Sequence, residues 1–187
     1  DPFLLKHKEK NICFVEDFLY SEKKGRISAI QLNGTQYKFL DVVLEENFHL
    51  SYPYVFKDNN EIYMVPETHA IREIRLYKNI EFPLKWKLEK ILKKNINAVD
   101  TSIFKKDDRW YMLTNICSSN MNDHNSELHI FHSEDLTSDR WLPINCGNPV
   151  IFDSMSARNG GLFISENNFF RINQIHAKGH YGKKFGI

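Results

Sequence analysis

The chain has 187 residues, 42% hydrophobic and 26% charged, which is the balance of a soluble globular protein with room for a sizeable core. Its 25 basic and 24 acidic residues leave a formal net charge of +1, without the basic excess typical of a nucleic-acid-binding protein. No apolar run is long enough to span a bilayer, and three widely spaced cysteines without a C-x-x-C or H-E-x-x-H pattern argue against a disulfide framework and a zinc site.

Four segments of the chain repeat one pattern without gaps. Each begins with an apolar strand of about five residues, continues through a polar turn and ends in a second strand rich in Tyr, Phe, Trp and Met. This pattern predicts a β-hairpin in each copy. The copies are residues 1–16, 52–67, 100–115 and 159–174.

Further strand-like runs follow each hairpin. They are 26–31 and 37–44, then 73–77 and 86–92, then 127–132 and 141–144, and finally 184–187. Four strands in a unit of about 50 residues is the scale of a propeller blade. We therefore predict an all-β β-propeller, one domain over 1–187, with blades 1–47, 48–96, 97–153 and an incomplete 154–187. A β-sandwich of independent hairpins is the alternative.

Polar side chains stand at one end of each predicted hairpin. The two strands are antiparallel, so the start of the first lies beside the end of the second. The innermost strands of a propeller line its central channel, so we expect these side chains at one rim of that channel. The pairs are Asp1 with Glu16, Tyr52 with Glu67, Asp100 with Asn115, and Asn159 with Gln174.

Such a ring of carboxylates and amides suits a carbohydrate. Sugar hydroxyls need hydrogen-bond acceptors and donors, and sugar faces stack on aromatic rings. Paired carboxylates also suit cleavage of a glycosidic bond, with one as acid and one as base. The structural alternative is that these residues cap backbone groups at the hairpin ends. No cofactor is predicted, although clustered oxygen ligands leave Ca²⁺ in the central channel open.

No signal peptide is visible, so a cytoplasmic protein is the default expectation. Because the sequence begins at Asp1 rather than at Met, an upstream leader or segment stays open. The unfinished fourth copy likewise indicates part of a longer protein, since a propeller must close to hide its edge strands.

Seven short motifs occur in order along the chain. They are Asp1-Pro2-Phe3, His49-Leu-Ser-Tyr-Pro-Tyr54, Met64-Val-Pro-Glu-Thr68, Ile71-Arg-Glu-Ile-Arg-Leu-Tyr77, Ala98-Val-Asp-Thr-Ser102, Ser156-Ala-Arg-Asn-Gly-Gly161 and Tyr181-Gly182. The combination resembles the N-terminal propeller domain of glucosamine inositolphosphorylceramide transferases and its bacterial relatives near polysaccharide-synthesis proteins. That domain is similar to the five-bladed propellers of family-43 and family-32 glycoside hydrolases. The resemblance therefore implies a five-bladed propeller that acts on or binds a glycan.

The hydrolase resemblance also implies roles for single residues. Asp1 matches the catalytic base that opens the first blade, and Asp100 matches the aspartate of the third blade that tunes the pKa of the acid. Those enzymes carry their general acid, a glutamate, at the start of a later blade. Here the matching stretch reads Ala157-Arg158-Asn159-Gly160 and has no carboxylate.

Three functions follow as hypotheses. The first is a glycosidase-like enzyme with Asp1 as base, Glu67 as acid, Asp100 as orienting carboxylate and Arg158 as a clamp for a carboxylate or phosphate. The second is a non-catalytic module that binds a glycan or sugar nucleotide for a glycosyltransferase or another sugar-modifying domain. The third is a protein-interaction platform. The predicted substrate-binding residues are Glu16, Tyr52, Asn115, Arg158, Asn159, Gln174 and Tyr181.

Overall fold

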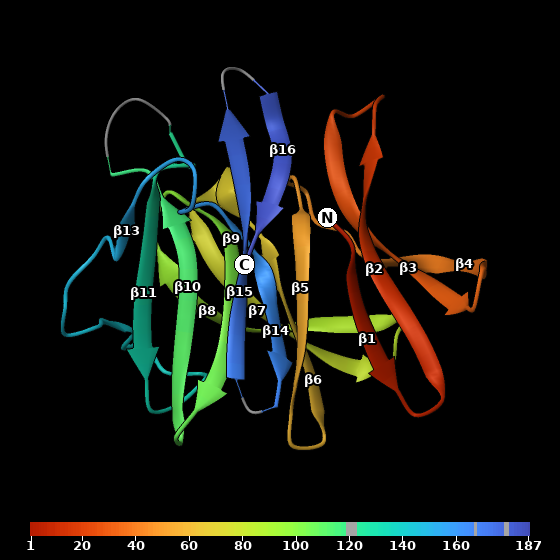
Figure 1. Cartoon of the computed structure of the whole chain (residues 1–187). Helices are drawn as coiled ribbons and strands as arrows, with labels where there is room; N and C mark the ends of the chain where they lie inside the picture. Colours follow the sequence, from red (N-terminus) through yellow and green to blue (C-terminus); the bar gives the residue numbers. More distant parts are fainter. Residues whose placement is uncertain (119–122, 167, 178–179) are drawn as a thin grey trace. The chain divides into compact units, whose positions relative to one another are not determined.

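The computed structural model describes residues 1–118, 123–166, 168–177 and 180–187, with the side chains of 176–182 outside that description. Within this described part the strands form four antiparallel sheets (Figure 1). The chain divides into two compact units, Asp1–Lys94 and Asn95–Ile187, and each unit contains two of the sheets. The organisation as a single domain stays a prediction.

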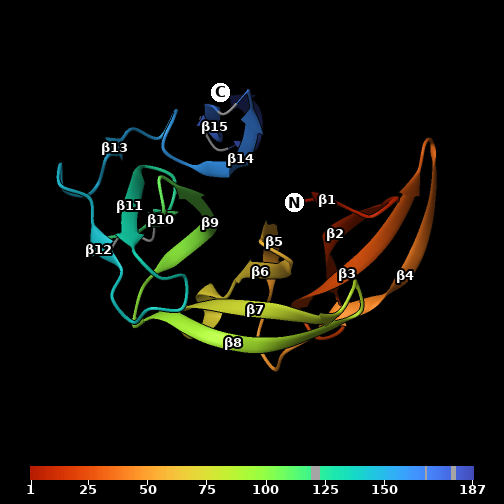
Figure 2. The same cartoon turned by 90° about the horizontal axis from the view of Figure 1, so that it is seen from below.

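The first unit contains two four-stranded sheets in which sequential strands pair as neighbours. The strands of the first sheet are β1 (Phe3–His7), β2 (Lys10–Leu19), β3 (Lys24–Asn33) and β4 (Gln36–Leu44). Those of the second are β5 (Ser51–Asp58), β6 (Glu61–Glu67), β7 (Glu73–Glu81) and β8 (Lys85–Lys94), with a short 3₁₀ helix at His69–Ile71. The first strands of the two sheets, β1 and β5, lie side by side, and later strands follow outward (Figure 2).

The second unit has one sheet built on a meander and one of three described strands. The former contains β9 (Ala98–Lys106), β10 (Arg109–Ile116), β11 (Glu127–Ser133), β12 (Leu142–Pro143) and β13 (Ile151–Phe152), with the two short strands both paired to β11. The latter contains β14 (Asn159–Ser165), β15 (Asn168–Ala177) and β16 (His180–Gly186). Here too the first strands of the two sheets, β9 and β14, are in contact.

Alternating side chains of the hairpins build a core in each unit. In the first unit, Ile12 and Phe14 of β2 and Ile27 of β3 are fully buried and pack against the second sheet. Phe14 meets Trp86 edge to face with ring centroids 5.6 Å apart. In the second unit, Leu113 and Leu128 form a smaller cluster with Ala157, among others. Burial alternates along part of β2, whereas β5, β6 and β9 are buried along most of their length.

The prediction of an all-β chain with four repeated sheets is confirmed. All the strands expected after the hairpins form, and the last of them begins at His180 rather than at residue 184 because β16 pairs along β15 from Ala177 onward. The short β13 and the 3₁₀ helix were not predicted. A fifth blade stays a prediction.

Candidate functional site

The hairpins of the second, third and fourth sheets share a register shift near the start of the first strand. The shifts lie between Ser51 and Tyr54, between the partners of Leu113 and Asn115, and between Asn159 and Gly161. Backbone φ is positive beside each shift, at +44° for Tyr52, +51° for Asp100 and +115° for Gly161. Bulges of this kind re-aim side chains and are common next to active sites.

The bulges change the partners that sequence alone predicts. Glu67 lies opposite Ser51 rather than Tyr52, and Asn115 lies opposite Val99 rather than Asp100. In the fourth sheet, Asn173 rather than Gln174 lies opposite Asn159. The reason is physical: an extra residue on the first strand displaces the ladder by one position beyond it.

In the second unit, Asp100 and Arg158 form a buried ion pair. Nε of Arg158 donates to Oδ2 of Asp100, and the side chains are 10% and 2% exposed respectively. Nε2 of Gln174 lies 3.4 Å from the same carboxylate oxygen, and Nη1 of Arg158 lies 3.4 Å from Oδ1 of Asn125. The carboxylate is therefore held by a cation and an amide inside the unit.

Three buried amides extend this cluster and connect the β9–β10 hairpin to the β14–β15 hairpin. Nδ2 of Asn115 donates to the carbonyls of Glu127 and Ala157 at 2.9 and 3.0 Å, and its Oδ1 accepts from the Asn159 backbone N–H at 2.7 Å. Nδ2 of Asn159 donates to the Asp100 carbonyl at 2.7 Å. Nε2 of Gln174 donates to the Asn159 carbonyl at 2.9 Å. These amides satisfy buried backbone groups, as buried polar groups must.

Glu127 forms a second polar cluster in the same unit. Ser118 Oγ donates to Oε2 of Glu127, and His129 Nε2 lies 3.1 Å from that oxygen. Burial raises the pKa of Glu127, but the hydrogen bonds from Ser118 and His129 outweigh burial, so the pKa is lowered overall.

This lowered pKa predicts acid destabilisation. The stabilising contribution of the Glu127 carboxylate is complete above its unfolded pKa of about 4.3, and it is lost as the pH falls through the lower folded pKa. Urea unfolding of the native chain and of Glu127→Gln at pH 7, 4 and 3 should give a stability difference that shrinks with acidity. The exposed Glu134→Gln serves as control, and a constant difference for Glu127→Gln would contradict this reading.

In the first unit, the hairpin end is more open. Asp1 is exposed and precedes β1, while Glu16 and Glu67 are partly exposed. Nε2 of His49 lies 3.6 Å from Oε1 of Glu16, with both side chains partly exposed. The backbone N–H of Gly25 donates to Nδ1 of His49 at 2.9 Å, so the neutral ring carries its proton on Nε2, which faces Glu16.

Two aromatic rings adjoin this pair. Phe18 is 39% exposed and Tyr20 is 87% exposed, and their ring centroids are 5.2 Å apart in an edge-to-face arrangement. The Phe18 ring also lies 6.0 Å from the His49 ring. Neither His49 nor Phe18 was predicted as a site residue. Phe18 follows Glu16 by two positions in β2 and so lies on the same face of the strand, a signal that could have found it, whereas His49 lies outside that strand.

The two predicted tyrosines are placed differently. Tyr52 is 1% exposed, and its ring packs edge to face on Phe3 at 4.8 Å, so its side chain belongs to the interior of the first unit. Tyr181 lies in β16, but its side chain is outside the described residues. A sugar-binding role for either residue stays a prediction.

Comparison with known proteins assigns the chain to a family. The model of the N-terminal region of glucosamine inositolphosphorylceramide transferase 1 matches residues 1–187. The chain belongs to this family. The protein of that name from Oryza sativa subsp. japonica is 36% identical over 189 residues, which cover 98% of this chain and 25% of the relative. The Arabidopsis thaliana protein is 33% identical over 192 residues, covering 100% of this chain and 25% of the relative.

The chain therefore spans about a quarter of the length of these curated relatives. Solved structures place this N-terminal domain among the β-propellers. An α-L-arabinanase from Cellvibrio cellulosa superposes with a TM-score of 0.72 at 13% identity, covering 98% of this chain and 71% of that one. A family-43 β-1,3-galactosidase superposes with a TM-score of 0.76 at 14% identity, covering 98% of this chain and 41% of that one. These likenesses establish the propeller fold.

The described part of the chain has neither a clustered set of metal ligands nor a membrane-spanning helix. Among the described residues no group of three His, Cys, Asp or Glu side chains is arranged to hold a metal ion. Ca²⁺ binding in a central channel stays a prediction. No helix in the described part of the chain is long and apolar enough to cross a bilayer.

Proposed function

We propose that this domain is a carbohydrate-binding module without hydrolytic activity, working alongside a sugar-transferring enzyme. The observation that carries the proposal is that Arg158 and Asn159, both bonded within the second unit, occupy the position where the hydrolase resemblance implies the general acid. Hydrolysis of a glycosidic bond requires two carboxyl groups that face the substrate, one of them protonated. Asp100, expected only to orient the acid, is 2% exposed and bonded to the Arg158 guanidinium, so it does not take the place of the missing acid.

The position of the missing acid supports the same view. Where the hydrolase resemblance implies a general-acid glutamate, the chain has Arg158 and Asn159, and both are bonded within the unit. With Arg158 and Asn159 in place of a glutamate, this position has no carboxylic acid to protonate the leaving oxygen of a glycosidic bond. The polar residues of the second unit hold two hairpins together rather than present an acid and a base.

The first unit offers groups that suit a sugar. Glu16 is an acceptor, the Nε2 proton of His49 is a donor, and the partly exposed Phe18 ring offers an apolar face. The curated relatives are named as transferases of glucosamine, whose ammonium group would complement Glu16 and the exposed Asp1. We therefore place the binding surface on Asp1, Glu16, Phe18 and His49, and we regard an amino sugar as the first ligand to test.

The experiment is calorimetric titration of the chain with glucosamine, N-acetylglucosamine and their nucleotide derivatives. Glu16→Gln should weaken binding about tenfold to a hundredfold, because a hydrogen bond to a charged group contributes about 1.5–3 kcal/mol. Glu61→Gln is the matched control, since Glu61 is a strand glutamate of the same unit that pairs with Lys78 at 3.0 Å. Absence of binding to every sugar, or equal weakening by both variants, would contradict the proposal.

A further inference from the structure

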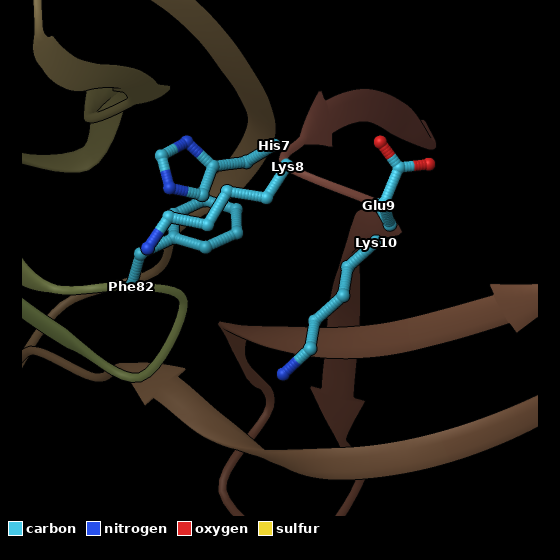
Figure 3. A pocket seen from close by; sticks show the side chains of 5 residues that line it. All are labelled: His7, Lys8, Glu9, Lys10 and Phe82. Carbon is cyan, nitrogen blue, oxygen red and sulfur yellow. The ribbon is translucent and has the colours of Figure 1, made fainter.

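The β1–β2 turn of the first unit forms a recess at the opposite end of the hairpin from Asp1 and Glu16. The recess has a volume of about 500 Å³ and is lined by His7, Lys8, Glu9, Lys10 and Phe82 (Figure 3). With a strand rise of about 3.3 Å per residue, it lies roughly 20 Å from the proposed sugar-binding surface. It is therefore separate from the site already described.

A second recess of about 300 Å³ adjoins the first and shares Lys10 and Phe82 with it. Lys38 of β4 adds a further cation to its lining. The remaining wall is mainly apolar and consists of Ile12, Leu40, Pro83 and Leu84, together with Gln31. The two adjoining recesses, together called the groove, are lined by three lysines and by an apolar wall in the second recess.

The lining of this groove has a net positive charge, since it contains three lysines and one glutamate. Lys8, Lys10 and Lys38 are exposed, and within the described part of the chain none of them forms an ion pair. The carboxylate of Glu9 points away from His7, Lys8 and Phe82 (Figure 3). Burial first, and then the cations Lys57 and Lys8, lower the pKa of His7.

An aromatic wall completes the recess. The rings of His7 and Phe82 lie 4.7 Å apart, centroid to centroid, and the Lys8 side chain extends alongside them (Figure 3). The Phe82 ring is half-buried and also packs against the core residue Phe14 at 6.2 Å. Because the ring is anchored in the core, the recess is a fixed feature of the unit rather than a chance grouping of mobile lysines.

We propose that this groove binds a phosphate ester, with Lys8 and Lys10 neutralising the phosphate, Lys38 at its edge, and Phe82 contacting the attached group. The dianion of a phosphate monoester suits several ammonium groups better than a carboxylate does, because it carries more charge and more acceptor oxygens. The ester is either a soluble phosphate monoester or the monoester headgroup of a lipid. The inference is independent of sugar binding, since the two surfaces share no residue.

Titration of the ¹⁵N-labelled chain with inorganic pyrophosphate at constant ionic strength tests the site. Saturable shifts should appear at the amides of His7, Lys8 and Lys10. The double variant Lys8→Gln/Lys10→Gln should raise the apparent Kd about fivefold to tenfold, because two nearby cations are removed. The control Lys23→Gln/Lys94→Gln removes the same charge from exposed lysines elsewhere in the first unit and should leave the Kd unchanged.

Equal weakening by the two double variants, or the same shifts with sodium chloride alone, would overturn the site. Co-sedimentation with vesicles of phosphatidylcholine containing one-fifth phosphatidic acid, whose headgroup is a phosphate monoester, separates the two sources of the ester. Vesicle binding that only Lys8→Gln/Lys10→Gln abolishes indicates a lipid headgroup. Pyrophosphate binding without binding to the vesicles indicates a soluble phosphate ester.

Discussion

Arg158→Met is expected to lower the free energy of unfolding by about 3–5 kcal/mol. The substitution keeps most of the buried side-chain volume but leaves the carboxylate of Asp100, which is 2% exposed, without its cation. An unpaired buried charge is the most unfavourable consequence of breaking an ion pair. Urea unfolding followed by tryptophan fluorescence measures the loss.

Two companion variants sharpen this test. Arg109→Met removes an exposed arginine from β10 of the same unit and should change stability by no more than about 0.5 kcal/mol. The double variant Asp100→Asn/Arg158→Met removes both charges, so it should recover much of the stability lost in Arg158→Met. If Arg158→Met proved as stable as Arg109→Met, the ion pair would not be a structural element of the second unit.

Gly25→Ala is expected to destabilise the first unit by about 3 kcal/mol, at the upper end of the range for overpacking. A Cβ at this position would lie 2.3 Å from the Leu50 carbonyl oxygen, 2.8 Å from Cε1 of His49 and 3.0 Å from Oε1 of Glu16. The first of these contacts is with backbone, which cannot rotate away. The change would also disturb the hydrogen bonds of Gly25 with Leu50 and His49, at 3.0 and 2.9 Å.

Gly34→Ala is the matched control for Gly25→Ala. A Cβ there meets nothing within 4 Å, but φ is +60°, so the expected loss is backbone strain of about 1 kcal/mol. Urea unfolding of the two variants should therefore differ clearly. Equal losses would mean that the close approach of β3 to Leu50 and His49 does not constrain the fold.

Sequence predicted the strands well because four copies repeat an apolar strand, a polar turn and an aromatic-rich strand without gaps. It did not predict the bulges. Three copies carry the same extra residue near the start of the first strand, so they align with one another without a gap and the alignment does not reveal the bulge. Asp100 tolerates positive φ and Gly161 favours it, but Tyr52 gives no sign of its φ of +44°.

The sequence predicted which residues lie at the candidate site, but it did not predict their hydrogen-bond and ion-pair partners. The sequence placed Asp100, Asn115, Asn159 and Gln174 at hairpin ends, and the structure places them there, bonded to one another or to backbone rather than open to a ligand. Arg158 was expected to clamp a carboxylate or phosphate of a substrate. It instead pairs with Asp100, which lies 58 positions earlier, and nothing local in the sequence indicates that partner. Pairing over such a distance depends on how β9 and β14 come together in the fold.

The most direct test of a binding module without hydrolysis is a single NMR experiment on the chain mixed with glucosamine glycosides and β-linked disaccharides. Saturation transfer from protein to sugar protons reports binding, and the anomeric region of the same sample reports cleavage over a day. We predict transfer to at least one sugar with no new anomeric signal. Release of a reducing sugar that Asp1→Asn abolishes would contradict the proposal and make the domain a glycosidase.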